Sequence, residues 1–500
     1  MNSLVPINRI PLDILSLIPT HLSSHQDCLC ASFVCLHWRR TFLPRGTLWS
    51  QLFLRHGEDY VKTFLERSQG SVLDITTIRD APLNLLFPYA QQIRQLEFQY
   101  NYWDEVLTFA QVNSRQFPLL RTLGIRINGE ARKQLKTLAA PSLPLFSGAA
   151  NLKEFVLDSM EEPKALKYFI FPNLTTFKLS APVMGMSEAS HLFNFLKASP
   201  MLQTVKLQLN GGLITKRIPQ EMVVTLPNVE TFSLVIKDPV DQVYEPAAHI
   251  LCLRARYTSL MHHKFVDDMD IKREIFPDSV SWKEIVCQYT KSPVEEVTLE
   301  VEDLDQPISF RECSLTFRSF DATVIRLGFR VIDSDIPTEN WDYYVPFVEI
   351  LSQAYRTIQG HPRLSHVKHF HMKGLADETG HLGTHEVTVM VKVFGDLLWS
   401  LGPLEELTIH GCDLELFLAP FIDPERFGSP ERGFPLIKEL MISEWVVDEH
   451  QWMDAIVELA ESQHRLGRPF ECMSVRTRGV PADMAERLRE WVSVADCYEA

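Results

Sequence analysis

A nine-residue pattern recurs along the chain and constrains its fold more than any other feature. Four segments carry apolar residues at positions one, four and six, and Asn or Cys at position nine. They are IRQLEFQYN (93–101), LRTLGIRIN (120–128), LQTVKLQLN (202–210) and LEELTIHGC (404–412). Each predicts a short strand with one buried face. Recurrence at intervals of a few tens of residues indicates stacked structural repeats rather than one compact core.

Nine further windows keep the three apolar positions without the final Asn or Cys. Successive windows begin 21 to 44 residues apart, and the longer intervals leave room for a helix, as in 186–200 and 345–360. The nine windows are Leu152/Phe155/Leu157, Leu174/Phe177/Leu179, Val229/Phe232/Leu234, Ile250/Leu253/Ala255, Val294/Val297/Leu299, Val324/Leu327/Phe329, Val367/Phe370/Met372, Ile437/Leu440/Ile442 and Phe470/Met473/Val475.

The pattern resembles the leucine-rich repeat, whose Asn or Cys bonds the backbone in the turn after a short strand. Strand-to-strand crossovers through helices are right-handed, so the repeats predict parallel strands inside and helices outside. The expected fold class is therefore α/β, with an irregular leucine-rich-repeat solenoid as the main body. An ordinary alternating βα protein without true repeats is the alternative.

The N-terminal segment IPLDILSLIPTHL (10–22) combines an apolar helical face with two prolines. Pro11 suits the first turn of a helix, where no backbone donor is needed. Ile10, Ile14, Ile18 and Leu22 then share one face. Pro19 predicts a kink or an end of this helix near Ile18. A domain of about 50 residues buries too little surface to enclose so many large apolar side chains, so a partner is expected to cover some of them.

Three blocks in this region resemble an F-box: residues 10–22 followed by Asp27-x-Leu29, then Val34-Cys35-x-x-Trp38-Arg39, then Leu48-Trp49. The sequence departs from the family pattern at Ile10 (usually Leu), at Asp13 (usually Glu) and at Pro19 (usually apolar). The resemblance implies a small three-helix module that docks on the Skp-type adaptor of a cullin ubiquitin ligase. The implied adaptor-binding residues are Ile10, Pro11, Ile14, Leu15, Ile18, Val34 and Trp38.

The expected domain organisation follows from these two resemblances. Residues 1–57 form an F-box-like helical domain, and residues 58–80 form a linking helix and a first strand at 72–75. Residues 81–500 form the irregular leucine-rich-repeat-like domain. An F-box followed by degenerate leucine-rich repeats is similar to the large F-box families of fungi. Without that docking role, the helical segment would be a cap packed on the rest of the chain.

Charge and cysteine usage narrow the function classes. The net charge is −15, and residues 1–57 hold five Arg and two Asp, so they carry +3 and the remainder −18. An acidic body disfavours binding to a nucleic-acid backbone. No apolar run is long enough to span a membrane, and no secretory signal is recognisable. The nine cysteines are scattered, which is typical of reduced thiols. A cytoplasmic or nuclear location is expected.

No pattern of catalytic or cofactor-binding residues is recognisable, so no enzyme activity, cofactor or metal is expected. Phosphate-binding glycine loops, the G-x-S-x-G elbow and H-E-x-x-H do not occur. Cys28, Cys30, Cys35 and His37 fit no common zinc spacing. The six histidines in 361–385 include His369 and His371, which would share one strand face, but a solvated strand edge is the favoured interpretation.

The expected function is that of a substrate-recognition subunit in a Skp–cullin–F-box ubiquitin ligase, which binds an unknown protein substrate through its repeats. The alternative is a repeat scaffold without a ligase role. Solenoids bind partners on the open strand face and on loops at its rim. Loop 333–346 carries the candidate substrate-binding residues Trp341, Tyr343 and Tyr344. The outward-pointing strand residues are expected to be Glu97, Arg126, Lys178, Lys206, Gln208, Thr408 and His410.

Overall fold

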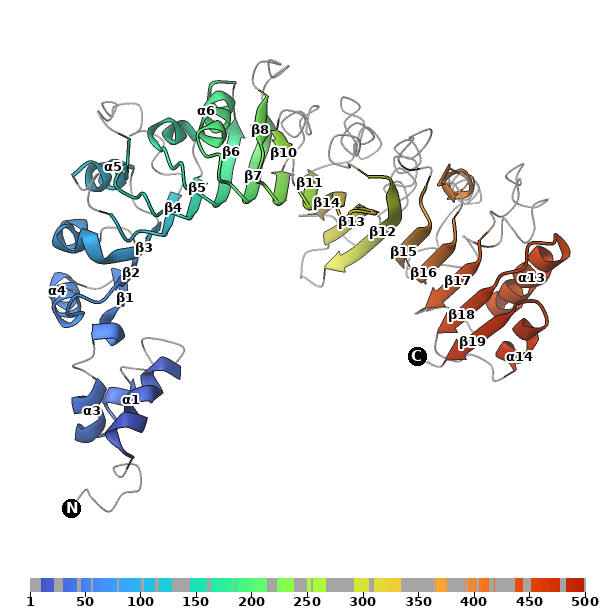
Figure 1. Ribbon diagram of the computed structural model, residues 1–500, viewed down its shortest axis with the longest axis horizontal. Helices are drawn as coiled ribbons and strands as arrows, with labels where there is room; N and C mark the ends of the chain where they lie inside the picture. Colours follow the sequence, from blue (N-terminus) through green and yellow to red (C-terminus); the bar gives the residue numbers. More distant parts are fainter. Residues whose placement is uncertain are drawn as a thin grey trace. The chain divides into compact units, whose positions relative to one another are not determined.

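The computed structural model shows an α/β protein whose strands form a long, mostly parallel sheet of 17 strands (Figure 1). Its residues divide into two compact units: unit 1 is 1–210 with 221–229, and unit 2 is 211–220 with 230–500. The structure describes residues 10–21, 30–42, 46–54, 57–78, 81–99, 103–112, 117–127, 144–159, 163–184, 186–213, 223–237, 250–252, 255–266, 292–304, 310–333, 364, 366–375, 392, 394–398, 400–401, 404–412, 418, 437–443, 451–476 and 483–498.

The strands of unit 1 are β1 (Gln51–Leu54), β2 (Leu73–Thr77), β3 (Ile93–Gln99), β4 (Thr122–Ile127), β5 (Glu154–Ser159), β6 (Thr176–Met184), β7 (Thr204–Leu213) and β8 (Val224–Leu226). Those from β1 to β7 follow chain order in the long sheet, whereas β8 lies outside it. Parallel pairing joins β1 to β2 and continues strand by strand to β6. The sheet thus begins at Gln51, inside the residues expected to belong to the helical domain.

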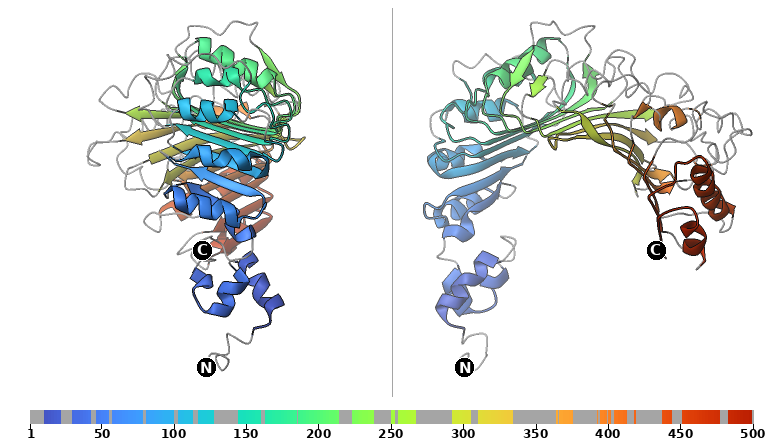
Figure 2. Two further views of the ribbon diagram at one scale, coloured as in Figure 1. Left: turned by 90° about the vertical axis from the view of Figure 1, so that its left-hand side faces the viewer. Right: turned by 45° about the vertical axis from the view of Figure 1, so that its right-hand side comes forward.

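The helices and 3-10 segments of unit 1 precede these strands or lie between them in the chain. They are α1 (Leu12–His21), α3 (Leu36–Phe42), η3 (Gly46–Trp49), α4 (Glu58–Arg67), η4 (Leu83–Gln92), α5 (Trp103–Val112), η6 (Pro163–Tyr168) and α6 (Met186–Lys197). Figures 1 and 2 show α4, α5 and α6 on the same side of the strands. The predicted α/β class, with parallel strands and with helices on one side of them, is confirmed for this unit.

Aromatic side chains fill the core between the strands and helices of unit 1. Phe155 on β5 is fully buried and lies within 5.8 Å, centroid to centroid, of Phe177 on β6 and Phe195 on α6. Phe98 on β3 makes an edge-on contact with Phe109 on α5 at 5.8 Å. Rings of successive repeats therefore pack on one another, and each repeat helps to bury the next.

Unit 2 contains a reversal that the repeat pattern did not predict. Its strands are β9 (Thr231–Lys237), β10 (Ile250–Cys252), β11 (Tyr257–Val266), β12 (Val294–Leu304), β13 (Phe310–Ser319), β14 (Val324–Asp333), β15 (His369–Leu375), β16 (Glu406–Cys412), β17 (Glu439–Ser443), β18 (Cys472–Arg476) and β19 (Val494–Tyr498). β11 pairs with β14 in parallel, β13 is antiparallel to both β14 and β12, and β12 pairs in parallel with β15. The expectation of parallel strands throughout was wrong here, because only five residues separate β12 from β13 and only four separate β13 from β14, too few for a helical crossover.

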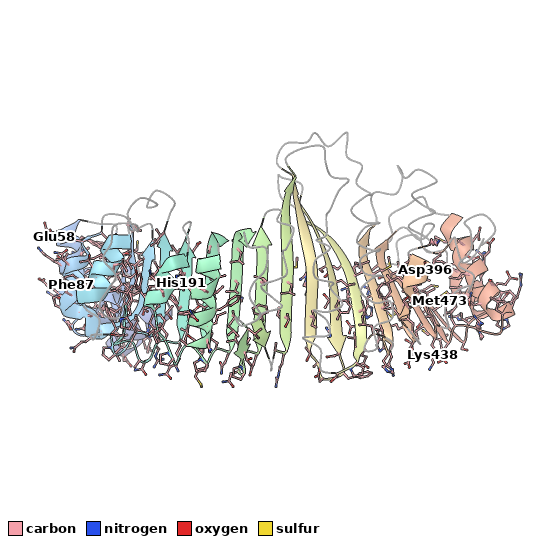
Figure 3. The ribbon with its side chains drawn as sticks, turned by 90° about the horizontal axis from the view of Figure 1, so that it is seen from above. Glu58, Phe87, His191, Asp396, Lys438 and Met473 are labelled. Carbon is pink, nitrogen blue, oxygen red and sulfur yellow. The ribbon has the colours of Figure 1, made fainter. Side chains whose placement is uncertain are left out.

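From β15 to β19 the strands are parallel and again follow chain order. Two further helices, α13 (Gln451–Arg465) and α14 (Met484–Arg489), cover one side of these strands (Figures 1 and 2). Leu440 on β17 and Met473 on β18 are fully buried, as is Leu488 on α14. Lys438 lies at the edge where the strands begin (Figure 3). The opposite face of these strands carries the polar residues.

One of the thirteen apolar windows fell at the wrong place. The window at 250–255 predicted a repeat strand, but the repeat strand there is β11, which begins at Tyr257. The backbone N–H groups of Arg256 and Tyr257 both donate to the carbonyl of Glu230, the bond pattern that opens a strand in other repeats. The true core positions are Ala255, Thr258 and Leu260, all buried. Ala and Thr are not among the large apolar residues that define the pattern, so the pattern did not locate this strand.

The N-terminal helical segment has a small core of its own. Leu15 on α1 packs with Ala31 and with Trp38 on α3, and Ile10, Ile18 and Cys35 lie partly buried against them. We call the described residues 10–21 and 30–42 the cap. Helix α1 continues to His21, so Pro19 does not end it at Ile18; a proline near a helix end removes one backbone bond without stopping the turn. The expected three-helix arrangement is not shown among the described residues.

Candidate functional site

The cap exposes large apolar side chains beside its small core. Ile14 and Leu17 lie three positions apart on α1, and so project from one side of the helix. Further exposed apolar residues follow the turn at 30–34. We call this set the cap surface: Ile14 (53% exposed), Leu17 (58%), Phe33 (70%), Val34 (51%) and Leu36 (59%). Single exposed apolar residues are common, but five among about 25 residues are typical of an interaction surface.

A cation lies beside this apolar surface. The Arg39 guanidinium carbon lies 5.0 Å from the centroid of the Phe33 ring. The turn that presents Phe33 and Val34 is closed by backbone bonds to Cys30 and Ala31, at 3.0 and 3.2 Å. The turn is therefore held by the backbone, while its side chains point away from the core. Such an arrangement presents apolar groups to a partner without requiring the cap to open.

The seven residues implied as adaptor contacts divide into two groups. Pro11, Ile14 and Val34 are exposed, and Ile10 and Ile18 are partly buried. Leu15 and Trp38 are buried in the core of the cap (0% and 9% exposed), and the seven adaptor contacts stay a prediction. Helical periodicity points Leu15 away from Ile14, since adjacent residues do not share a face. Leu17, Phe33 and Leu36 were not among the implied contacts, although Phe33 directly precedes the Val34–Arg39 motif and Leu36 lies within it.

The open strand face of unit 1 bears a ladder of opposite charges. Adjacent strands pair Arg94 with Asp74 (Nε to Oδ1, 3.0 Å), Arg126 with Glu97 (3.0 Å) and Lys178 with Glu154 (2.7 Å). The predicted outward positions of Glu97, Arg126 and Lys178 are confirmed by these contacts. Exposed pairs of this kind contribute little stability. Because each charge has an opposite neighbour, the ladder is locally neutral.

The open strand face of unit 2 is richer in polar contacts. Strands β12, β15, β16, β17 and β18 align three rows of residues, as their register shows. The first row is Glu296, His369, Glu406, Glu439 and Cys472. The second is Thr298, His371, Thr408, Met441 and Ser474. The third is Glu300, Lys373, His410, Ser443 and Arg476.

Histidines and carboxylates bond one another across these strands. His369 Nδ1 lies 2.9 Å from Glu406 Oε2, and His371 Nε2 lies 3.9 Å from Glu296 Oε1. His410 Nδ1 lies 2.9 Å from the Ser443 hydroxyl. Burial lowers the pKa of His371, against the opposing influence of Glu406 and Glu296. The predicted placement of His369 and His371 on one strand face is confirmed.

Next to β12, strands β13 and β14 continue this face, and some of their polar side chains are buried. Thr298, Ser314 and Ser259 sit on the open side by register, yet their exposed fractions are only 9%, 2% and 7%. The Ser314 hydroxyl has no hydrogen-bond partner among the described residues. Glu300 on β12 lies directly opposite Ser314 in the register.

The structure also bears on the metal, substrate-loop and membrane predictions. Among the described residues, no group of three or more His, Cys, Asp or Glu is arranged to hold a metal ion. Of the cysteines and histidine weighed as zinc ligands, Cys30 is exposed and Cys35 and His37 are half-buried. Trp341, Tyr343 and Tyr344, with Cys28, lie outside the described residues. No helix in the described part of the chain has the length and apolar character needed to cross a membrane.

No protein-family model matches this chain, and no curated protein matches it in sequence.

Proposed function

We propose that the chain is the substrate-recognition subunit of a Skp–cullin–F-box ubiquitin ligase. The cap would bind a Skp-type adaptor, and the strand faces would hold a protein substrate. One observation carries the proposal: a cap with its own closed core displays five large apolar side chains, each more than half exposed. A helical cap that served only to cover the repeats would bury such residues against them.

The proposed mechanism is proximity. An adaptor bound at the cap and a substrate bound at the repeats would be held within one assembly, which raises the local concentration of substrate lysines near the ubiquitin-conjugating enzyme. This role requires no bond-breaking by the chain itself. It does require two binding surfaces that work at the same time, and the cap surface and the unit 2 strand face involve different residues.

The test is co-purification of the full chain with a Skp-type adaptor. The informative variant is Ile14→Asp with Val34→Asp, because both side chains are about half exposed and a charge there spares the core. Leu466→Asp, at a site 62% exposed in unit 2, is the matched control. We expect the wild type and the control to capture the adaptor in equal amounts, and the double variant to lose capture.

Circular dichroism would establish that the double variant is folded. If the folded wild type captures no adaptor, or if the double variant captures it unchanged, the docking role is wrong. The alternative of a repeat scaffold without a ligase role would then be preferred. Leu15→Asp is not a suitable probe, since a charge in the cap core would unfold the cap and abolish any binding indirectly.

A further inference from the structure

Strand β19 lies at the end of the parallel strands of unit 2. Among the described elements, β18 pairs with it in parallel and α14 packs on one side of it. Figure 1 shows β19 as the outermost of the strands β15 to β19. A strand in this position has one bonded edge and one edge whose backbone N–H and C=O groups have no strand beside them. Within the described residues, the second edge of β19 is therefore open.

The hydrogen bonds to β18 show which groups point to the open edge. The Val494 N–H donates to the Glu471 carbonyl at 3.1 Å, so Val494 faces β18. Alternate residues of a parallel strand bond the same neighbour, which turns Asp496 toward β18 as well, and Ala495 and Cys497 away from it. No described residue accepts a hydrogen bond from the N–H groups of Ala495 and Cys497. Their N–H and C=O groups thus remain for an added strand.

The side chains of β19 give this edge a chemical preference. Val494 is 48% exposed and Asp496 is half-buried, and both lie on the open strand face because they alternate with the buried Ala495. Among the described residues, none forms an ion pair with Asp496. The cation Arg476 on β18 stands opposite Tyr498, two residues beyond Asp496, and leaves that carboxylate unpaired. A side chain beside Asp496 on an added strand would therefore meet an uncompensated negative charge.

A second copy of the chain fits this edge poorly. Two β19 strands related by a two-fold axis would pair antiparallel, and the register that uses both open-edge residues places Ala495 opposite Cys497 of the other copy. Asp496 then lies directly opposite its own counterpart, and like charges in that position are destabilising. A segment that brings a cation opposite Asp496 and an apolar residue opposite Val494 avoids this repulsion.

We propose that β19 binds an extended, basic and apolar segment of the substrate by strand addition. The proposal rests on the function proposed above, since it supplies a docking mode for that substrate. Backbone groups of the segment bond the N–H and C=O groups of Ala495 and Cys497, which gives affinity with little regard to sequence. A Lys or Arg beside Asp496, two residues from an apolar side chain beside Val494, gives the preference.

The experiment measures retention of the full chain on an array of nine-residue peptides with randomised flanks. Each peptide has an apolar residue two positions from a central Lys, Gln or Glu. We expect the Lys peptides to be retained roughly threefold above the Gln peptides, and the Glu peptides least. N-methylation of alternate backbone groups of the Lys peptide should abolish retention in one phase and spare it in the other, because every second residue faces β19.

Cys497→Pro tests the edge itself. Proline is tolerated in an edge strand where its nitrogen points away from the paired neighbour, and its ring there would block an added strand. Retention of every peptide should be lost. Cys497→Ala is the matched control, since it keeps the N–H group and should retain the peptides as the wild type does. Urea unfolding checks that the proline variant is folded, and unchanged retention by the folded variant would overturn the proposal.

Asp496→Lys tests the preference and replaces the proline variant if that variant is unfolded. It should reverse the order, so that Glu peptides are retained roughly threefold above Gln peptides. Glu439→Lys is its control, since Glu439 is an exposed carboxylate on the same face, two strands away, and should leave the order unchanged.

Four other results would also overturn the proposal. They are an Asp496→Lys chain that still prefers Lys, equal retention of the Lys, Gln and Glu peptides by the wild type, and equal retention of the two N-methylated peptides. The fourth is a dimer, seen in light scattering, that Cys497→Pro abolishes, because it would assign the edge to a second copy of the chain.

The two proposals can fail separately. Adaptor capture reports on the cap, whereas peptide retention reports on β19. If the wild type captures the adaptor while no peptide is selected, this inference fails and the docking role stands. If peptides are retained through the edge and adaptor capture is absent, β19 belongs to a binding protein without a ligase role.

Discussion

The side-chain amide of Asn173 donates a hydrogen bond to the backbone carbonyl of Ala150 in the preceding repeat, at 3.0 Å. Asn151 makes the same bond to Pro118 at 2.7 Å, and Asn228 makes it to Pro200 at 3.0 Å. In all three, the asparagine lies in the turn just before a strand. The amide therefore links one turn of unit 1 to the turn before it, as a backbone donor would.

Replacing Asn173 with Ala should destabilise unit 1 by about 1 kcal/mol, because one carbonyl loses its donor at an exposed site. Urea unfolding followed by circular dichroism measures this effect. Asn173→Asp is a useful comparison, since aspartate cannot donate and should cost at least as much. A midpoint unchanged by either substitution would show that water replaces the amide without loss.

Gly46 should not tolerate a side chain. A Cβ at this position would lie 2.2 Å from the backbone oxygen of Ser68 and 2.5 Å from the Ser71 hydroxyl. The backbone oxygen cannot move aside cheaply, so Gly46→Ala should displace η3 from the end of α4. We expect a destabilisation of about 1–3 kcal/mol from this overpacking. Gly57→Ala is the control, because nothing lies within 4 Å of its added Cβ; equal melting temperatures for the two variants would contradict the prediction.

The turn between β13 and β14 should stabilise the protein less in acid than at neutral pH. Burial would raise the pKa of Asp321, but hydrogen bonds from Ser319, Thr323 and Ser292 outweigh it and lower the pKa to about 2. The Ser319 hydroxyl and the Thr323 N–H both donate to Asp321 Oδ1, at 2.5 and 3.2 Å. A lowered folded pKa stabilises the protein above the unfolded value near 3.8, and this contribution is lost as the pH falls toward 2.

Asp321→Asn should therefore flatten the dependence of the unfolding free energy on pH between about 4 and 2. Urea titrations of both proteins across that interval measure it. A mutant whose stability falls with acid as steeply as that of the wild type would show that other carboxylates dominate. The outcome also bears on the reversed strands, since this turn joins two of them.

His371, like Asp321, should make the protein less stable as the pH falls, but in a range near neutrality rather than in strong acid. Its pKa is lowered chiefly by burial, although Glu406 and Glu296 raise it; His369 and Lys373 add to the lowering. The unfolded chain then binds more protons than the folded chain just below the ordinary histidine pKa of 6.5, so stability falls as the pH drops through that region. His371→Gln should remove this slope, as measured by thermal unfolding between pH 7 and 5. A slope that persists in the variant would assign it to other histidines.

Much of the sheet could be predicted because the repeat pattern records burial. Leu152, just before β5, and Phe155 and Leu157 within it occupy core positions, and their spacing alone identifies the strand. The pattern failed where core positions hold Ala and Thr, as in β11. It also failed at β13, because antiparallel pairing depends on which strand lies beside it, and spacing within one strand does not encode that neighbour.

The surface of the candidate sites was harder to predict than the core. An apolar helix such as α1 offers both Ile14 and Leu15, and only the packing of Trp38 decides which one is buried. The open edge of β19 was missed entirely, because the buried Ala495 is not a large apolar residue and no window identified this strand. Its character depends on which strands lie beside it, and spacing within one strand does not encode that.

The reversed strands β12, β13 and β14 have a consequence for how unit 2 unfolds. In a regular repeat stack each strand depends on the repeats just before and after it, so unfolding can spread one repeat at a time. Here the order across the sheet is β11, β14, β13, β12 and β15, so the three strands β12 to β14 lie in the reverse of their chain order. None of the strands β11, β12, β13 and β14 can leave the sheet alone without exposing the edges of its neighbours. Amide hydrogen exchange should therefore protect them with one common free energy of opening, as a single cooperative block within an otherwise stepwise molecule.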